Sequence, residues 1–156
     1  MKVKIFHGSH DYFEKILLYK CCDIGFHCGT LEQALCRIMD SSKCYTETFF
    51  KAYVYEININ INNKNCIELP DCISWADFGY VKTQFSHYHP NMNIQNIKTI
   101  EELRNFLLGI GIKYIRYENK IEGKGHSYII LDENINFKQY TVREIINKIS
   151  EKYEGS

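Results

Sequence analysis

Two short stretches rich in histidine and glycine are the places where this sequence could perform chemistry. The first is His7-Gly8-Ser9, and the second is Gly25-Phe26-His27-Cys28-Gly29-Thr30. Each lies at the edge of an apolar run and precedes a predicted helix, where outward-pointing N–H groups and a glycine let a ligand approach the main chain. Either histidine, considered alone, is typical of a structural turn. Together the two stretches support the hypothesis that they form two walls of one binding site.

Metal binding and cysteine chemistry are the obvious alternatives, because the chain has seven cysteines and six histidines. The sequence contains no Cys-x-x-Cys pair, and in an extended His87-Tyr88-His89 the two imidazoles would point to opposite faces, so we expect no metal site. A cysteine nucleophile needs a histidine and an orienting group nearby in space, which spacing alone does not reveal. Gly109-Ile110-Gly111 follows a predicted helix and lacks the third glycine of a dinucleotide-binding motif, so it is interpreted as a helix end.

The composition favours one compact domain over residues 1–153. Of the 156 residues, 45% are hydrophobic and 14% aromatic, which is ample for a core. Nineteen basic and nineteen acidic side chains cancel, so a small or neutral ligand or a protein surface is favoured as partner over nucleic acid. No apolar run is long enough to span a bilayer, and no membrane contact is expected. The odd number of irregularly spaced cysteines fits a reducing, cytoplasmic compartment.

Alternating and helical periodicities predict the elements that must position these residues. Strands are expected at residues 2–6, 25–28, 53–61, 112–117 and 127–131, with a short return strand at 66–69 after a turn at 62–65. Helices are expected after Asp11, Thr30, Thr99 and Thr141, because each is followed three residues later by Glu or Gln, as in a capping box. Residues 71–96 fit either short helices or a folded loop. Several connections are too short for parallel crossovers, so a mixed α+β fold is expected.

Three of these segments resemble the ADP-ribosyltransferases, in the branch that includes diphtheria toxin and the poly(ADP-ribose) polymerases. His7-Gly8-Ser9 is similar to that family's first-strand histidine followed by Gly and Ser or Thr. Gly25-Phe26-His27 is similar to its Gly-x-aromatic element, with His27 where tyrosine is usual. Ser127-Tyr128-Ile129-Ile130-Leu131-Asp132 is similar to a late polymerase strand, although Ser127 stands where that strand has the catalytic glutamate.

A closer resemblance is to the ADP-ribosyltransferase domains of phage and mobile-element polyvalent proteins. It adds Leu69-Pro70-Asp71 running to Trp75, and Asn119-Lys120-Ile121-Glu122-Gly123 before Ser127-Tyr128. The motifs occur in order over most of residues 5–138, and although each is short, the ordered set is fairly specific. The resemblance implies an ADP-ribosyltransferase-like fold, with mixed, mostly antiparallel split β-sheets flanked by short helices.

The resemblance also implies NAD as a substrate and assigns roles to individual residues. Removal of nicotinamide from NAD passes through a sugar cation like that of glycoside cleavage, which a carboxylate must stabilise. We expect Glu122 to orient the ribose and activate the acceptor, with Glu118 as the competing carboxylate. His7 is expected to contact a ribose hydroxyl, and His27 either to stack on nicotinamide or to donate a hydrogen bond. The expected NAD-binding residues are His7, Gly8, Ser9, His27, Gly29, Thr30, Ser127 and Tyr128.

These features predict a mono-ADP-ribosyltransferase that transfers ADP-ribose from NAD to a macromolecular acceptor, with a protein favoured over a nucleic acid. Polymer formation is not expected, because Ser127 replaces the polymerases' glutamate. The resemblance implies a bacterial or phage toxin or effector, cytoplasmic or delivered into a target cell. Two alternatives stay open: an NAD glycohydrolase, and a degenerate module that binds NAD or a protein without transferring anything.

Overall fold

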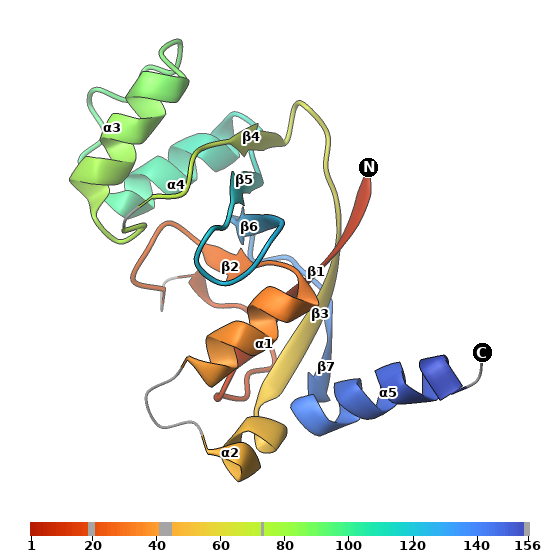
Figure 1. Ribbon diagram of the computed structural model, residues 1–156. Helices are drawn as coiled ribbons and strands as arrows, with labels where there is room; N and C mark the ends of the chain where they lie inside the picture. The colour runs from red at the N-terminus through yellow and green to blue at the C-terminus, as the bar shows by residue number, and fades with distance from the viewer. Residues whose placement is uncertain (19–20, 41–44, 73, 155–156) are drawn as a thin grey trace.

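The structure, a computed structural model, describes residues 1–18, 21–40, 45–72 and 74–154 (Figure 1). In this part of the chain it is an α+β protein with two β-sheets and five helices. The expected α+β class is therefore confirmed, and so is the mostly antiparallel character of its sheets.

The first sheet has three antiparallel strands, in the order β1 (Lys2–Ser9), β3 (Tyr53–Asn60) and β7 (Phe137–Thr141). β3 is the central strand, and its Ile57 lies opposite Ile5 of β1 and Phe137 of β7. The alternating sequence of β3 places Tyr55, Ile57 and Ile59 on one face, where all three side chains are buried. This alternation fixes the register of the sheet, because a slip by one residue would place Glu56 and Asn58 on the inter-sheet face.

The second sheet has four strands, in the order β2 (Phe26–Cys28), β6 (His126–Ile130), β5 (Tyr114–Glu118) and β4 (Cys66–Glu68). Neighbouring strands are antiparallel except β4 and β5, which are parallel. The predicted turn at 62–65 forms, but β4 does not return against β3. It joins the second sheet instead, so the chain crosses from one sheet to the other at this turn.

Five helices flank the sheets: α1 (Leu31–Met39), α2 (Thr46–Lys51), α3 (Phe78–Tyr88), α4 (Ile100–Gly109) and α5 (Val142–Glu154). The predicted caps form where Thr30, Thr99 and Thr141 accept hydrogen bonds from the N–H three residues later. α3 occupies part of the ambiguous stretch at 71–96 and is capped by Asp77. Figure 1 shows α3 and α4 together beside β4, whereas α2 and α5 lie at the opposite end of the molecule.

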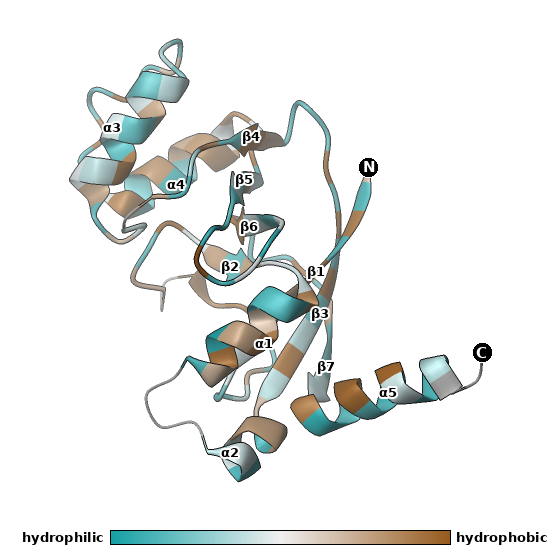
Figure 2. Cartoon of the chain, viewed as in Figure 1, coloured by the Kyte–Doolittle hydropathy of each residue, from teal (hydrophilic) through white to brown (hydrophobic). Residues whose placement is uncertain are grey.

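Three clusters of buried side chains hold these layers together. The first packs α3 and α4 against the second sheet and includes Val81, Phe85, Leu103, Leu107 and Ile115. The second lies between the two sheets and includes Ile5, Ile57, Phe26, Tyr128 and Ile130. The third packs helices on the first sheet and includes Ile38, Val54, Val142 and Ile145. Figure 2 shows apolar and polar residues alternating along α5, whose apolar side supplies two members of the third cluster.

The two sheets are joined by main-chain hydrogen bonds at one bridge in the described chain. Phe6 of β1 and Gly29, the residue after β2, exchange two N–H···O bonds of 2.8 Å each. Beyond this bridge, a side chain connects the two strands: His7 Nδ1 donates a hydrogen bond to the main-chain oxygen of His27 at 2.6 Å. β1 and β2 therefore separate at the two histidines, and the space that opens between the sheets starts there.

The helix predicted after Asp11 does not form, which corrects that expectation. The segment instead crosses the inter-sheet core irregularly, with Ile16 buried. Phe13 stacks on Tyr55 with ring centroids 3.9 Å apart. Tyr55 Oη accepts from the Phe13 N–H at 2.9 Å and donates to the Asp11 carbonyl at 3.0 Å. These tertiary contacts override a local capping signal that was worth little by itself.

The six cysteines that the structure describes are unpaired, and Cys44 lies outside the described residues. Burial raises the pKa of the Cys28 thiol well above its ordinary value and that of Cys72 to about 11. Both therefore behave as small hydrophobic side chains rather than as nucleophiles. Among the helices of the described chain, none is both long and apolar enough to cross a membrane.

Tyr55→Phe is predicted to lower the free energy of unfolding by about 1–2 kcal/mol, because it leaves the Phe13 N–H and the Asp11 carbonyl without their hydroxyl partner. Urea unfolding followed by circular dichroism measures the change. Tyr53→Phe is the matched control, since Tyr53 is a half-buried tyrosine of the same strand. Equal stabilities for the Tyr55→Phe variant and the wild type would contradict the anchoring role of this hydroxyl.

Candidate functional site

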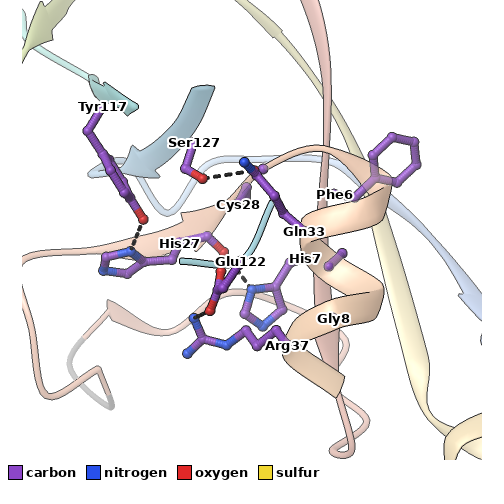
Figure 3. A pocket seen from close by; sticks show the side chains of 12 residues that line it. Phe6, His7, Gly8, His27, Cys28, Gln33, Arg37, Tyr117, Glu122 and Ser127 are labelled. Atoms are coloured by element: carbon purple, nitrogen blue, oxygen red, sulfur yellow. Dashed lines mark hydrogen bonds and ion pairs between the residues drawn. The ribbon is translucent and has the colours of Figure 1, made fainter. Parts of the chain in front are cut away.

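A small cavity lies where the two sheets separate, and most of the residues singled out by sequence gather around it (Figure 3). β1, β2, α1 and the β5–β6 region all contribute to its wall. The lining residues are Phe6, His7, Gly8, His27, Cys28, Gly29, Gln33, Ala34, Arg37, Tyr117, Glu122 and Ser127. Both histidine–glycine stretches thus line the same cavity.

Two larger cavities adjoin this one, and His27 and Arg37 border all three. One of about 450 Å³ extends along His7, Phe13 and the segment after β1. The other, of about 290 Å³, extends toward Trp75 and also includes Glu122. Cavities of several hundred Å³ are the size that small molecules and cofactors occupy. His27 and Arg37 therefore lie where the three cavities border one another.

His7 is held as a neutral imidazole. Its Nδ1–H donates to the His27 main-chain oxygen, and its ring lies on Phe26 with centroids 4.1 Å apart. Burial lowers the pKa of His7 to about 4, an effect to which nearby Arg37 adds. A neutral histidine with its proton on Nδ1 has Nε2 as a hydrogen-bond acceptor. That is the form suited to a ligand hydroxyl.

Both ring nitrogens of His27 have polar neighbours. Its Nε2 lies 3.0 Å from Asp23 Oδ2, and its Nδ1 lies 3.2 Å from Tyr117 Oη. Burial disfavours the charged form of Asp23, but hydrogen bonds from His27 and from the Gly25 N–H outweigh it and lower the pKa of that carboxyl. Arg104, buried on α4, anchors the turn by donating to the main-chain oxygen of Asp23 at 2.8 Å. The His27 ring is thereby oriented as one rigid wall of the site.

Glu122 is the acidic residue that lines the small cavity. Its Oε1 lies 3.9 Å from Arg37 Nη1, its Oε2 accepts from Asn119 Nδ2 at 3.2 Å, and its side chain is 28% exposed. Glu118, the competing candidate, is an exposed residue at the end of β5 and borders a separate cavity with His126. The geometry therefore favours Glu122 over Glu118 as the acid of this site.

A buried polar network supports the loop that carries Glu122. Ser127, 3% exposed, donates from its hydroxyl to Gln33 Oε1 at 2.9 Å and accepts from Asn119 Nδ2 at 3.1 Å. Asn119 Oδ1 in turn accepts from the Glu122 N–H at 3.0 Å. Ser127 thus lines the small cavity, and its hydroxyl serves the network.

The other residues expected to bind NAD lie at different positions in and around these cavities. A Cβ at Gly8 would overlap the Ala34 carbonyl of α1, and one at Gly29 would overlap Gln33 Oε1, so both glycines are required by close packing. Thr30 caps α1. The remaining two residues differ: Ser9 borders the cavity of about 450 Å³, whereas Tyr128 is buried in the inter-sheet core and lines none of the three cavities.

Sequence reasoning missed four residues that shape the site: Asp23, Gln33, Arg37 and Tyr117. Gln33 was recognised only as the second half of a capping box. A signal for Arg37 was present, because it follows Gln33 by four residues and so lies on the same face of α1. Tyr117 and Asp23 carried no comparable signal, since their contacts with His27 depend on how the strands are arranged.

No protein-family model matches the chain, and comparisons with curated proteins and with solved structures gave no match. Within the described residues, no three His, Cys, Asp or Glu side chains are grouped so as to hold a metal ion.

Acid destabilisation provides a test of the buried neutral His7. His7 has a pKa of 6.5 in the unfolded chain and of about 4 in the folded protein. Between these two pH values the unfolded chain therefore binds a proton at His7 that the folded protein does not bind. Stability from this residue is thus fully present above pH 6.5 and is lost as the pH falls to about 4, by at most about 3 kcal/mol. His7→Gln is predicted to weaken this acid dependence, as measured by urea unfolding at several pH values. His87→Gln, at an exposed histidine of α3, is the control. Identical acid dependence in the His7→Gln variant and the wild type would contradict the assignment.

Proposed function

We propose that the protein is a mono-ADP-ribosyltransferase with an ADP-ribosyltransferase-like fold. The observation that carries the proposal is the convergence of His7, His27 and Glu122 on one cavity from segments far apart in the chain. Two sheets that separate at one bridge fit the split-sheet architecture expected for this family. The role of bacterial or phage effector belongs to the same proposal and rests on the sequence resemblance.

NAD fits the adjoining cavities by size and chemistry. The cavity of about 450 Å³ offers the aromatic side chains Phe13 and Phe26 for a flat base and Lys15 for a phosphate. Arg37, which borders all three cavities, is a cation suited to the pyrophosphate. His7 Nε2 is available in the neutral, acceptor form that a ribose hydroxyl requires. Nicotinamide and its ribose would then lie beside His27 and Glu122.

The proposed reaction needs a carboxylate at the position of Glu122. The bond from ribose C1′ to the nicotinamide ring nitrogen breaks, and its electron pair leaves with neutral nicotinamide. The Glu122 carboxylate stabilises the positive charge left on the sugar. The acceptor nucleophile then bonds to C1′ and gives its proton to Glu122. A carboxylate oriented by Asn119 and partly open to solvent can perform both tasks.

A protein acceptor fits the cavity of about 290 Å³ on the Trp75 side. Glu122 borders this cavity as well as the small one, so an acceptor entering there meets the carboxylate. Trp75 and Tyr117 supply aromatic walls, with ring centroids 5.0 Å apart. Ile121, 82% exposed, lies next to Glu122 and gives an apolar contact for a partner surface. The partial exposure of Glu122 also admits water, which is the basis for the alternative NAD glycohydrolase.

The function is tested by incubating the protein with labelled NAD and host lysate. We expect label transfer to macromolecules, and a loss of about 10²–10⁴-fold in Glu122→Gln, which keeps the shape of the side chain but cannot accept the proton. His7→Ala is expected to weaken NAD binding. Glu118→Gln is the matched control and should retain activity, since Glu118 lies outside the site.

The outcomes separate the competing functions. Protease-sensitive label indicates a protein acceptor, and nuclease-sensitive label a nucleic acid. Nicotinamide release at an equal rate without lysate indicates a glycohydrolase, and NAD binding without release indicates a degenerate binding module. Label transfer that survives both Glu122→Gln and His7→Ala contradicts the site, while neither turnover nor NAD binding by the wild type contradicts the function.

Arg37→Ala is predicted to raise the KM for NAD about tenfold or more, because it removes the guanidinium group that would donate charged hydrogen bonds to the pyrophosphate. Arg37→Lys should recover part of the affinity, since the charge remains without the planar fork. Initial rates of nicotinamide release against NAD concentration measure both effects. Arg143→Ala, at an exposed position of α5, is the control. An unchanged KM in Arg37→Ala would show that this cation does not contact NAD.

A further inference from the structure

We propose that Gln33 is a positioning residue for Glu122: its buried side-chain amide fixes the loop that carries the carboxylate. The inference deepens the proposed function and rests on it. It assigns a role in the reaction to a residue whose sequence signal was only that of a helix cap.

The Gln33 side chain is satisfied on both sides by protein atoms. It is 2% exposed, and its Oε1 accepts from the Thr30 N–H at 2.9 Å and from the Ser127 hydroxyl at 2.9 Å. Its Nε2 lies 3.2 Å from the carbonyl oxygen of Gly123, 3.4 Å from that of Lys124 and 3.2 Å from that of Gly125. One NH₂ group therefore faces three successive carbonyls of the loop directly after Glu122.

The loop has a backbone that needs such a clamp. Gly123 and Gly125 have φ of 130° and 111°, conformations that other residues rarely adopt. Glycines also leave a chain many alternatives, so the observed arrangement requires fixed partners. Gln33 supplies the donors on one side of the loop, while Asn119 holds the Glu122 N–H and carboxylate on the other. Glu122 thus sits between two amide anchors.

Gln33 also ties the carboxylate to its cation. Arg37 lies one turn further along α1, and its Nη1 is 3.9 Å from Glu122 Oε1. A loop clamped to Gln33 keeps Glu122 in register with the face of α1 that bears Arg37. Because both ends of the Gln33 amide are occupied by protein atoms, the residue acts through Glu122 and not by contact with substrate.

The experiment is a double-mutant cycle on nicotinamide release by the full chain, using wild type, Gln33→Ala, Glu122→Gln and the double variant. Gln33→Ala is expected to lower kcat by about 10–100-fold, as is usual when a residue that orients a catalytic group is lost. The KM for NAD should change little. In the Glu122→Gln background, Gln33→Ala should cause little further loss, because it acts through the carboxylate already removed.

Gln33→Glu separates the clamp from the helix cap. Glutamate retains an acceptor for the Thr30 N–H, as in the common capping box, but sets a second oxygen against the three carbonyls. We expect it to lower kcat as Gln33→Ala does. Met39→Ala, at an exposed position of the same helix, is the control. Hydrogen exchange of the amides in residues 119–126 should be faster in both Gln33 variants, with circular dichroism confirming that each remains folded.

Each result bears on the inference. Equal fold-losses from Gln33→Ala with and without Glu122→Gln overturn it, and so does an effect confined to the KM for NAD. A full kcat in Gln33→Glu overturns the proposed role of the hydrogen bonds from Gln33 to the loop carbonyls and leaves only its role in capping α1. An inactive wild type refutes the proposed function and the positioning role with it. An active wild type beside a fully active Gln33→Ala variant refutes the positioning role alone.

Discussion

The site depends on the two main-chain hydrogen bonds between Phe6 and Gly29. They hold two sheets together at one bridge, and the strands separate immediately beyond it. A side chain at Gly29 would collide with Gln33, so this bridge also requires the glycine that sequence analysis singled out. The His7 imidazole then spans the first step of the opening through its bond to the His27 carbonyl. The cavity is therefore a consequence of how the sheets are joined.

Charge is distributed unevenly around this cavity. On one side His7 is kept neutral by burial, and on the other the Asp23 carboxylate lies 3.0 Å from His27 Nε2. Arg37 and Glu122 face each other at 3.9 Å, which leaves each partly unpaired and open to a ligand. In a substrate that carries a negative pyrophosphate and a developing sugar cation, the pyrophosphate would lie toward Arg37 and the sugar cation toward Glu122.

The sequence predicted the parts of the fold that are set by local pattern. The alternation in β3, the caps at Thr30 and Thr99, and the histidine stretches all appear where expected. Elements decided by tertiary contact were missed: α2, β7, and the irregular path after Asp11, where Tyr55 captures Phe13. In the site, the motif residues were identified from the resemblance of short sequence motifs. The residues that orient these motif residues, above all Gln33, could not be identified in this way. Their roles depend on contacts between distant segments, which sequence periodicity does not predict.

The hydrogen bonds of Gln33 to residues 123–125 also constrain the order in which the protein folds. They join positions separated by 90–92 residues along the chain, so they close one of the longest loops in the molecule. Closing such a loop costs entropy that only the surrounding β2–β6 and β5–β6 pairings can offset. Contacts of this sequence separation form late and slow the folding of the domain. During synthesis, the histidine walls emerge long before the loop that carries Glu122, so the wall of the cavity is incomplete until β6 has paired.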